Sequence, residues 1–353
     1  MVERDSLMNQ LGITCPVFQA PMAGGGDTAE LVAAVSNAGG LGFVGASYLT
    51  PEQIVERGRA VRALTAKPFG VNLFVPLPEP VVDSDQMERA AARLAPYYAE
   101  LGIEPPVVTK TAGFDFWAQL EAVCKTEARA FSFAFGMLPE RAMAEVKRRG
   151  LWVAGTATTV EEAVLLQRSG VDAVVVQGSE AGGHRGTFAT DFGAGMIGLM
   201  ALVPQVVDAV RVPVIASGGI MDARGIRAAR ALGASAVQMG TAFLTCVEAG
   251  ISQAYQDAIM HAAEADIVTT RAFSGRPARG IANRVMRDLA AHESEIAPFP
   301  VQNALTRPLR AEAGKRGRAE FLSLWAGQGV RMARRGSAAE LIARIQAELA
   351  REV

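Results

Sequence analysis

Two segments, Gly170-Val-Asp-Ala-Val-Val-Val-Gln-Gly178 and Gly233-Ala-Ser-Ala-Val-Gln-Met-Gly240, share one pattern that decides the fold. Each begins with a glycine suited to a left-handed helix C-cap, continues as a short apolar run, and closes on Gln followed closely by Gly. Short apolar runs bounded by glycine predict buried strands. The pattern therefore predicts two similar βα units, with strands at Ala173–Gln177 and Ala236–Met239.

Similar runs occur through the rest of the chain as far as residue 245. They are Val17–Gln19, Leu41–Val44, Phe69–Phe74, Phe131–Phe135, Trp152–Gly155 and Val214–Ala216. Amphipathic helical stretches separate them: Thr28–Ala38, Pro51–Leu64, Glu140–Arg149, Val160–Ser169 and Asp222–Leu232. Apolar strands alternating with helices indicate a parallel sheet whose outer face is covered. Eight such units favour an α/β fold of the closed (β/α)₈ type, a TIM barrel, over an open doubly wound sheet.

Two parts of the chain exceed what a minimal barrel requires. Residues 76–128 predict an inserted helical segment after the third strand, with one helix at Gln86–Leu101. Residues 246–353 change to helices rich in Ala, Arg and Glu, with a proline-rich break at Pro298–Pro308. We therefore expect a barrel over residues 1–245 and a C-terminal helical extension that caps the barrel mouth.

Composition excludes several classes of protein. Half of the 353 residues are hydrophobic and 20% are charged, which predicts a large core. A formal net charge of −1 gives no indication of nucleic-acid binding. The basic stretches Arg141–Arg149 and Arg307–Arg318 are interpreted as solvated helix faces.

Location is predicted from the cysteines and from the absence of a targeting pattern. The three cysteines, Cys15, Cys124 and Cys246, are scattered and odd in number, which favours a reducing compartment. The N-terminal residues lack a secretion-signal pattern. The longest uncharged run, Phe192–Val207, is too short and too rich in Gly and Pro for a membrane helix. We expect a cytoplasmic protein with no membrane partner. The sequence does not decide between a monomer and a homo-oligomer.

The loops after the seventh and eighth predicted strands indicate a phosphate site. Ala216-Ser-Gly-Gly-Ile220 opens a helix, and Gln238-Met-Gly-Thr-Ala242 follows the last strand. Loops after these two strands often bind phosphate in TIM barrels, through backbone N–H groups and helix N-termini. Tight turns alone would also explain the glycines. The pair of loops favours binding by Ser217, Gly218, Gly219, Gln238, Met239, Gly240 and Thr241.

Other strand ends carry residues suited to a flat heterocycle. Gln19-Ala-Pro-Met22 is a small, rigid turn that can lie against a ring, although turn chemistry alone would explain Pro21. Asn72 is polar within an apolar strand and needs partners if buried. Its amide can serve a heterocycle edge, or it can be a satisfied core residue.

The most informative stretch is Val176-Gln-Gly-Ser-Glu-Ala-Gly-Gly-His-Arg-Gly186. Gln177 ends a strand, and Gly182 permits close approach of backbone to a ligand. His184, on a glycine-rich loop before Arg185, is a candidate acid, base or anion-binding group. A solvated loop histidine is the plainer alternative. No His or Cys lies near it with zinc-ligand spacing, so no metal is predicted.

These motifs together resemble the nitronate monooxygenases, specifically the bacterial class I type. The resemblance spans nearly the whole chain, and its most specific motif is Gln177-Gly-Ser-Glu-Ala-Gly-Gly-His184. The other matching segments are Gln19–Met22, Ala34–Gly42, Pro68–Phe74, Ala216–Ile220, Gln238–Phe243, Phe273–Arg279 and Leu324–Gly329.

The resemblance implies a metal-free FMN enzyme that oxidises alkyl nitronates, such as propionate 3-nitronate, with O₂ to carbonyl compounds and nitrite. It implies FMN contacts from Asn72, Gln177, Gly182, Gly219 and the run from Gln238 to Thr241. Pro21 and Met22 would lie near the ring, and His184 would face the substrate, with Arg185 or Arg307 as further candidates for the nitro oxygens. Where relatives place tyrosines and a lysine, this chain has Phe299, Asn303 and Arg307.

Two alternatives remain at this point. One is an FMN-dependent NAD(P)H reductase of quinones or enoyl thioesters, because related barrels share the phosphate loops. The other is a protein that binds flavin or a phosphate ligand without turnover, against which the converging polar residues at the mouth argue mildly.

Overall fold

A closed parallel barrel forms the centre of the molecule. The structure, a computed structural model, describes residues 4–107 and 115–351. Its barrel strands are β1 (Val17–Gln19), β2 (Gly42–Gly45), β3 (Phe69–Phe74), β4 (Ala130–Ala134), β5 (Trp152–Ala157), β6 (Ala173–Gln177), β8 (Val214–Ser217) and β9 (Ala236–Met239). All pair in parallel in the order β1-β9-β8-β6-β5-β4-β3-β2. The ring closes where Phe18 of β1 bridges Leu41 next to β2. The predicted (β/α)₈ barrel is thus confirmed.

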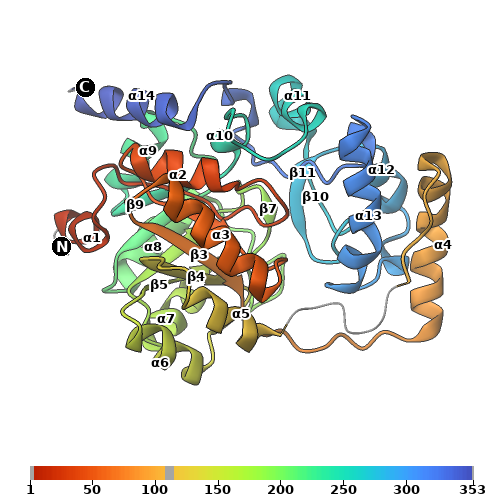
Figure 1. Ribbon diagram of the computed structural model, residues 1–353, viewed down its shortest axis with the longest axis horizontal. Helices are drawn as coiled ribbons and strands as arrows, with labels where there is room; N and C mark the ends of the chain where they lie inside the picture. Colours follow the sequence, from red (N-terminus) through yellow and green to blue (C-terminus); the bar gives the residue numbers. More distant parts are fainter. Residues whose placement is uncertain (1–3, 108–114, 352–353) are drawn as a thin grey trace.

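A ring of helices surrounds the strands (Figure 1). It comprises α2 (Ala29–Asn37), α3 (Pro51–Leu64), α5 (Phe116–Val123), α6 (Glu140–Arg148), α7 (Val160–Arg168), α8 (Leu199–Ala209), α9 (Ala223–Ala231) and α14 (Ala338–Ala350). Side-chain caps start many of them. Thr50 and Gln53 form a capping box before α3, for example, and Pro51 occupies the first turn. The last helix, α14, returns from the far end of the chain to pack between α2 and α9.

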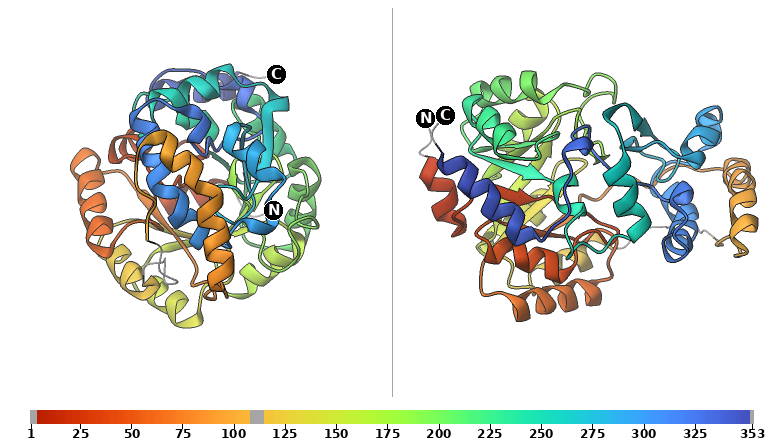
Figure 2. Two further views of the ribbon diagram at one scale, coloured as in Figure 1. Left: turned by 90° about the vertical axis from the view of Figure 1, so that its right-hand side faces the viewer. Right: turned by 90° about the horizontal axis from the view of Figure 1, so that it is seen from above.

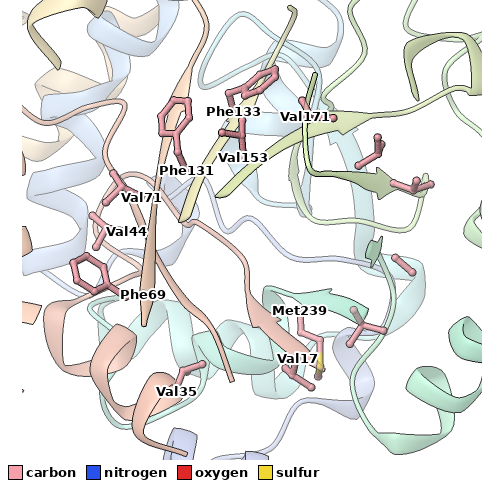
Figure 3. Packing of buried hydrophobic residues seen from close by; sticks show 14 of the residues in the cluster. Val17, Val35, Val44, Phe69, Val71, Phe131, Phe133, Val153, Val171 and Met239 are labelled. Atoms are coloured by element: carbon pink, nitrogen blue, oxygen red, sulfur yellow. The ribbon is translucent and has the colours of Figure 1, made fainter. Parts of the chain in front are cut away.

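Two apolar layers stabilise the barrel. The larger layer lies between strands and helices and includes Val35 of α2, Val71 of β3 and Phe131 of β4 (Figure 3). The smaller layer fills the barrel interior, where Phe18 packs against Trp152 with ring centroids 6.1 Å apart. The interior is closed at its floor by Leu7 and Leu11 of α1 (Arg4–Leu11), so the opposite end alone is available for a ligand.

A second group of elements, here called the outer lobe, lies over the open end of the barrel (Figure 2). It contains α4 (Ser84–Leu101), α11 (Gln253–His261), α12 (Arg284–Ala290) and α13 (Val301–Lys315). It also contains β10 (Ile267–Thr270) and β11 (Ala278–Ile281), which form an antiparallel sheet with β7 (Gly183–His184). The short helices are α10 (Thr241–Leu244), η1 (Glu264–Asp266), η2 (Glu293–Glu295), η3 (Ala319–Phe321) and η4 (Val330–Met332).

The two predicted additions therefore divide between barrel and lobe. Within residues 76–128, α4 joins the lobe, whereas α5 packs beside α3 in the barrel ring; residues 108–114 of this segment lie outside the described part. Residues 246–353 supply most of the lobe, including its strands, and then return to the barrel as α14. Arg93 of α4 pairs with Glu295 at 2.8 Å, which links the insertion to the C-terminal part. No helix in the described part is long and apolar enough to cross a membrane.

Candidate active site

One cavity opens at the carboxyl ends of the strands, beneath the outer lobe. The residues that the sequence predicted to contact the cofactor, together with His184, line this cavity. The set is Pro21, Met22, Asn72, Gln177, Gly182, His184, Ser217, Gly218, Gly219, Gln238, Met239, Gly240 and Thr241. Parallel strands bring these residues together because their carboxyl ends meet at one edge of the barrel.

The rim turns, Ser217–Ile220 after β8 and Gln238–Ala242 after β9, present free backbone donors to the cavity. The amides of Gly218, Gly219 and Gly240 donate no hydrogen bond to any described residue. Gly218 has φ 129° and Gly219 has φ 67°, backbone conformations that side chains disfavour and glycine adopts freely. Unpaired amides beside one another form a site for an anion such as phosphate.

In the turn after β8 the donors lie in the turn itself and not at the start of α9. Asp222 is the N-cap of α9, and its carboxylate accepts from the amide of Arg224 at 3.0 Å. It also pairs with the Arg224 guanidinium at 2.6 Å, which lowers the pKa of the carboxyl. The sequence had suggested that the helix after β8 faces the phosphate with its N-terminus; Asp222 instead caps that end, whereas Gly240 is the N-cap of α10 and no side chain caps that helix.

A buried carboxyl group holds the turn after β1. Asp27 accepts from the amide of Met22 at 2.6 Å and from the amide of Gly45 at 2.7 Å. Burial raises the pKa of Asp27 to about 7, although these two hydrogen bonds lower it. The apolar face of Pro21 and Met22 is thereby fixed against the cavity.

Asn72 and Gln177 are held in different ways. Asn72 donates to the Ser132 hydroxyl at 2.9 Å, and its side-chain oxygen accepts no hydrogen bond from the described residues. Gln177 donates to the carbonyl of His184 at 3.0 Å and accepts from the amide of Gly186 at 2.8 Å. Gln177 thus fixes the loop that carries His184, while the Asn72 oxygen stays available to a ligand.

The imidazole of His184 lies in an aromatic cage formed by Phe74, Phe135, Phe299 and Trp325. Its ring centroid is 6.5, 5.8, 6.0 and 5.7 Å from theirs, respectively. Gly183, with φ 74°, turns the chain into the cage, and β7 pairs with β11 so that His184 lies opposite Ala278. Nε2 is buried without a hydrogen-bond partner. A buried polar atom without a partner, at the wall of a cavity, indicates a ligand contact.

The electrostatic environment keeps this imidazole neutral. Burial lowers the pKa of His184 to about 3, and the charges of Arg276 and Arg310 add to the effect. Arg276 lies 4.0 Å above the ring of Phe135 and is held by the carbonyls of Arg185 and Thr187. At neutral pH His184 therefore offers a neutral hydrogen-bonding group beside two cations.

Two neighbours of His184 have structural tasks. Arg185 donates to the carbonyls of Gln177 and Gly178, each at 2.7 Å, and to that of Gly195. Its guanidinium fixes the loop and does not line the cavity, so the expectation that it contacts nitro oxygens was wrong. Glu180 accepts from the amide of Leu199 at 2.8 Å and thus anchors the start of α8.

The outer lobe and the loop after β2 contribute polar residues to the cavity, of which sequence reasoning had singled out Asn303 but not Arg310 or Tyr48. Arg310 and Asn303 of α13 line it, together with Tyr48 from the loop after β2. Arg307, the expected candidate, is exposed and lies outside the cavity. The interpretation of Arg307–Arg318 as a solvated face was therefore wrong at Arg310. The strand-end position of Tyr48 was the available signal for that residue.

The fold and the site define a class: a (β/α)₈-barrel enzyme with turns suited to an anion after its last two barrel strands and a half-buried histidine in its cavity. Residues 4–348 match the family model described as nitronate monooxygenase. The chain belongs to the nitronate monooxygenase family. This family comprises flavin-dependent oxidoreductases, so the chain is an oxidoreductase of that kind.

Individual relatives agree with this assignment. A probable nitronate monooxygenase from Staphylococcus haemolyticus is 44% identical over 331 residues, covering 93% of this chain and 92% of the relative. One from Staphylococcus aureus (strain Newman) is 43% identical over 334 residues, covering 94% of each. Nitroalkane oxidase from Streptomyces ansochromogenes has a similar structure, with TM-score 0.89, 41% identity and 98% of both chains covered. FabK from Thermotoga maritima has TM-score 0.76 and 29% identity, covering 98% of this chain and 95% of that one.

Proposed function

We propose that the protein binds FMN and oxidises alkyl nitronates with O₂ to carbonyl compounds and nitrite. The observation that carries this proposal is the joint presence, in one cavity, of the unpaired amides of the rim turns and the unpartnered Nε2 of His184. The first suits the phosphate of FMN. The second suits an anionic substrate that carries its own acceptor oxygens.

The residues present fit FMN along the whole cavity. Gly218, Gly219, Gly240 and Thr241 would hold the phosphate. Ser217, Gln238, Met239, Gln177 and Gly182 would line the path from the phosphate to the ring. Pro21 and Met22 would lie against the ring, and the free oxygen of Asn72 would accept from its edge. When bound, FMN supplies the electron acceptor for the nitronate and the electron donor for O₂.

His184 would bind and orient the substrate. A nitronate is already an anion and needs no strong base, which agrees with an imidazole whose pKa is about 3. Nε2, when it carries the proton, donates to a nitronate oxygen, and the nearby cations Arg276 and Arg310 stabilise the negative charge. The aromatic cage excludes water from this end of the cavity.

Two measurements test the proposal. The purified protein should show flavin absorption bands and release FMN on denaturation, and it should produce nitrite from propionate 3-nitronate in air. His184→Asn should retain FMN and lose most of its turnover. Colourless, folded protein that does not bind added FMN would refute the cofactor assignment, and unchanged nitronate kinetics in His184→Asn would refute the role of the histidine.

The NAD(P)H reductase alternative makes an opposite prediction in the absence of oxygen. Rapid bleaching of the flavin by NADH or NADPH would favour that activity. We expect bleaching by nitronate under the same conditions and slow or no bleaching by either nicotinamide. The scattered, unpaired cysteines favour a cytoplasmic location, which we propose as well.

A further inference from the structure

A second recess lies directly behind the aromatic cage of His184. It has a volume of about 480 Å³, is open to solvent, and is lined by Phe192, Arg271, Gly275, Arg276, Pro277 and Phe299. None of these residues belongs to the rim turns or to the other residues assigned to FMN. The recess therefore lies outside the space that the cofactor would occupy.

The partition between the recess and the main cavity is one side chain thick. Phe299 lines the recess, and its ring centroid is 6.0 Å from that of His184, which lines the main cavity. Arg276 also lines the recess, and its guanidinium lies 4.0 Å from the ring centroid of Phe135, a residue of the main cavity. A rotation of the Phe299 side chain would therefore join the two spaces beside the imidazole.

Two guanidinium groups give the recess a positive charge. Arg271 donates to the Gly275 carbonyl at 3.1 Å, and Arg276 donates to two backbone carbonyls at 3.2 and 2.7 Å. Within the part of the chain that the structure describes, these acceptors are uncharged and no carboxylate forms an ion pair with either group. Burial lowers the pKa of Arg276 to about 10, although the charge of Glu162 raises it, so the group stays charged at neutral pH. Unpaired cations at an open recess attract small anions.

The turn that carries both arginines packs directly against the segment of Phe299. The Gly275 amide donates to the Arg271 carbonyl at 2.8 Å and closes the turn. Gly275 has φ 81°, and a side chain at this position would collide with the Ala297 carbonyl and the Phe299 amide. The cationic groups therefore lie beside the residue that separates the recess from His184.

We propose that this recess is the entry and exit site for the small anions of the reaction: Arg271 and Arg276 bind the nitronate before it passes Phe299 to reach His184, and bind the nitrite as it leaves. This inference rests on the proposed function and adds the route by which substrate and product travel. Both anions carry their charge on two oxygens attached to one nitrogen. The planar guanidinium group can bind such a pair of oxygens through two parallel N–H groups.

The rates of nitrite binding test the route. Stopped-flow absorbance of the flavin-loaded protein, without nitronate, gives the association and dissociation rate constants of nitrite. Arg271→Gln should lower both about fivefold and change their ratio, the dissociation constant, about twofold or less. The ratio is preserved because the charges that act on His184 are those of Arg276 and Arg310, and Arg271 is not among them. A residue of the route changes both rates together, whereas a residue of the final site changes their ratio.

Arg287→Gln is the matched control for the loss of one positive charge. Arg287 is exposed on α12 of the outer lobe and lines neither the recess nor the main cavity. Its loss should leave both rate constants near those of wild type, because solvent and salt screen its charge. Unchanged rate constants in Arg271→Gln, equal effects of the two substitutions, or an effect on the dissociation constant alone would overturn the proposal.

A reversible plug tests the recess itself. Arg271→Cys is treated with benzyl methanethiosulfonate, which fills the recess, or with aminoethyl methanethiosulfonate, which restores a positive charge. The benzyl group should slow nitrite association about tenfold or more, and the aminoethyl group should recover part of the wild-type rate. The controls are Arg287→Cys and wild type, whose Cys15 and Cys246 are buried and whose Cys124 is half-buried. Nitrite association that is unaffected by the benzyl group would show that the anion enters elsewhere and would overturn the proposal.

A crystallographic measurement locates the anion without any need for flavin or turnover. Wild-type crystals soaked in bromide should show anomalous density between the guanidinium groups of Arg271 and Arg276, and crystals of Arg271→Gln should lack it. Absence of bromide from the wild-type recess would overturn the entry site. Failure of the protein to form nitrite from nitronates would refute the proposed function, while the position of bromide and the rates of nitrite binding would still decide the role of the recess.

Discussion

Replacing His184 by Phe should make the protein less sensitive to acid while abolishing its substrate contact. The imidazole is neutral in the folded state down to about pH 3, whereas an unfolded histidine titrates near pH 6.5. The folded pKa is the lower one, so the unfolded state binds the extra proton. Stability is therefore unaffected above pH 6.5 and falls as the pH decreases from 6.5 toward 3.

The size of this loss in unfolding free energy depends mainly on the pKa of His184 in the unfolded state, because at pH 5 the imidazole of the folded protein is still neutral. The interval from 6.5 to 5 at 1.36 kcal/mol per pH unit gives a loss of about 2 kcal/mol between pH 7.5 and pH 5. Phe is close to the imidazole in shape and suits a cage of Phe74, Phe135, Phe299 and Trp325. We expect the variant to lack this loss.

Urea unfolding of both proteins at pH 7.5 and pH 5, saturated with FMN, measures the difference. All other titrating groups are common to the two proteins and cancel in the comparison. The same pH dependence in wild type and variant would refute the assignment of a neutral, desolvated imidazole. An independent check is ¹³C-histidine NMR: the resonance missing from His184→Phe should not titrate between pH 8 and pH 5.

Three further changes test other parts of the site. Gly219→Ala places a side chain at φ 67°, with its Cβ 3.2 Å from Glu180 Cβ, and should weaken FMN binding about tenfold in a fluorescence titration; unaltered affinity would contradict the role of this turn. Asp27 has a pKa of about 7 in the folded state, above its unfolded value of 3.8, so the folded state binds the extra proton. The unfolding free energy of wild type therefore rises by about 1.4 kcal/mol through this group as the pH falls from 8 to 6. Asp27→Asn should lose that gain in denaturant unfolding, and a retained gain would mean that another group titrates. Glu162→Ala removes the acceptor of the amides of Thr158, Phe188 and Ala189, although the Thr158 hydroxyl keeps the Thr187 hydroxyl as a partner, and should lower the unfolding free energy by about 3 kcal/mol; a loss below about 1 kcal/mol would show that water replaces the carboxylate.

The barrel was predictable because its signals are local. Each strand is a short apolar run, and its predicted bounds differ from the observed ones by at most two residues; Trp152–Gly155, for example, extends to Ala157. The rim glycines were recognisable for the same reason, since the strand order of a barrel places consecutive strand ends side by side. The proximity of the residues after Ser217 and after Met239 could therefore be predicted without any knowledge of long-range packing.

The outer lobe was less predictable because its contacts join distant parts of the chain. Which face of α13 turns inward depends on how α13 packs against α4, about 200 residues earlier, where Tyr98 donates to the carbonyl of Leu305 across a separation of 207 residues. A helical sequence pattern with several arginines cannot distinguish Arg310, which is half-buried and lines the cavity, from the exposed Arg307. The short strands β10 and β11 were missed because each has only four residues and pairs mainly with the other.

The pairing of β7 with β11 means that His184 is attached to both the barrel and the outer lobe at once. Its backbone is bonded on one side to the carboxamide of Gln177 from the barrel and lies on the other in register with Ala278 from the lobe. Any hinge motion that lifted the lobe to admit a substrate would pull on the histidine as well. Substrate entry and the positioning of His184 would then be coupled. An exchange of lobes between relatives would change the position of this histidine as well as the lining of the cavity.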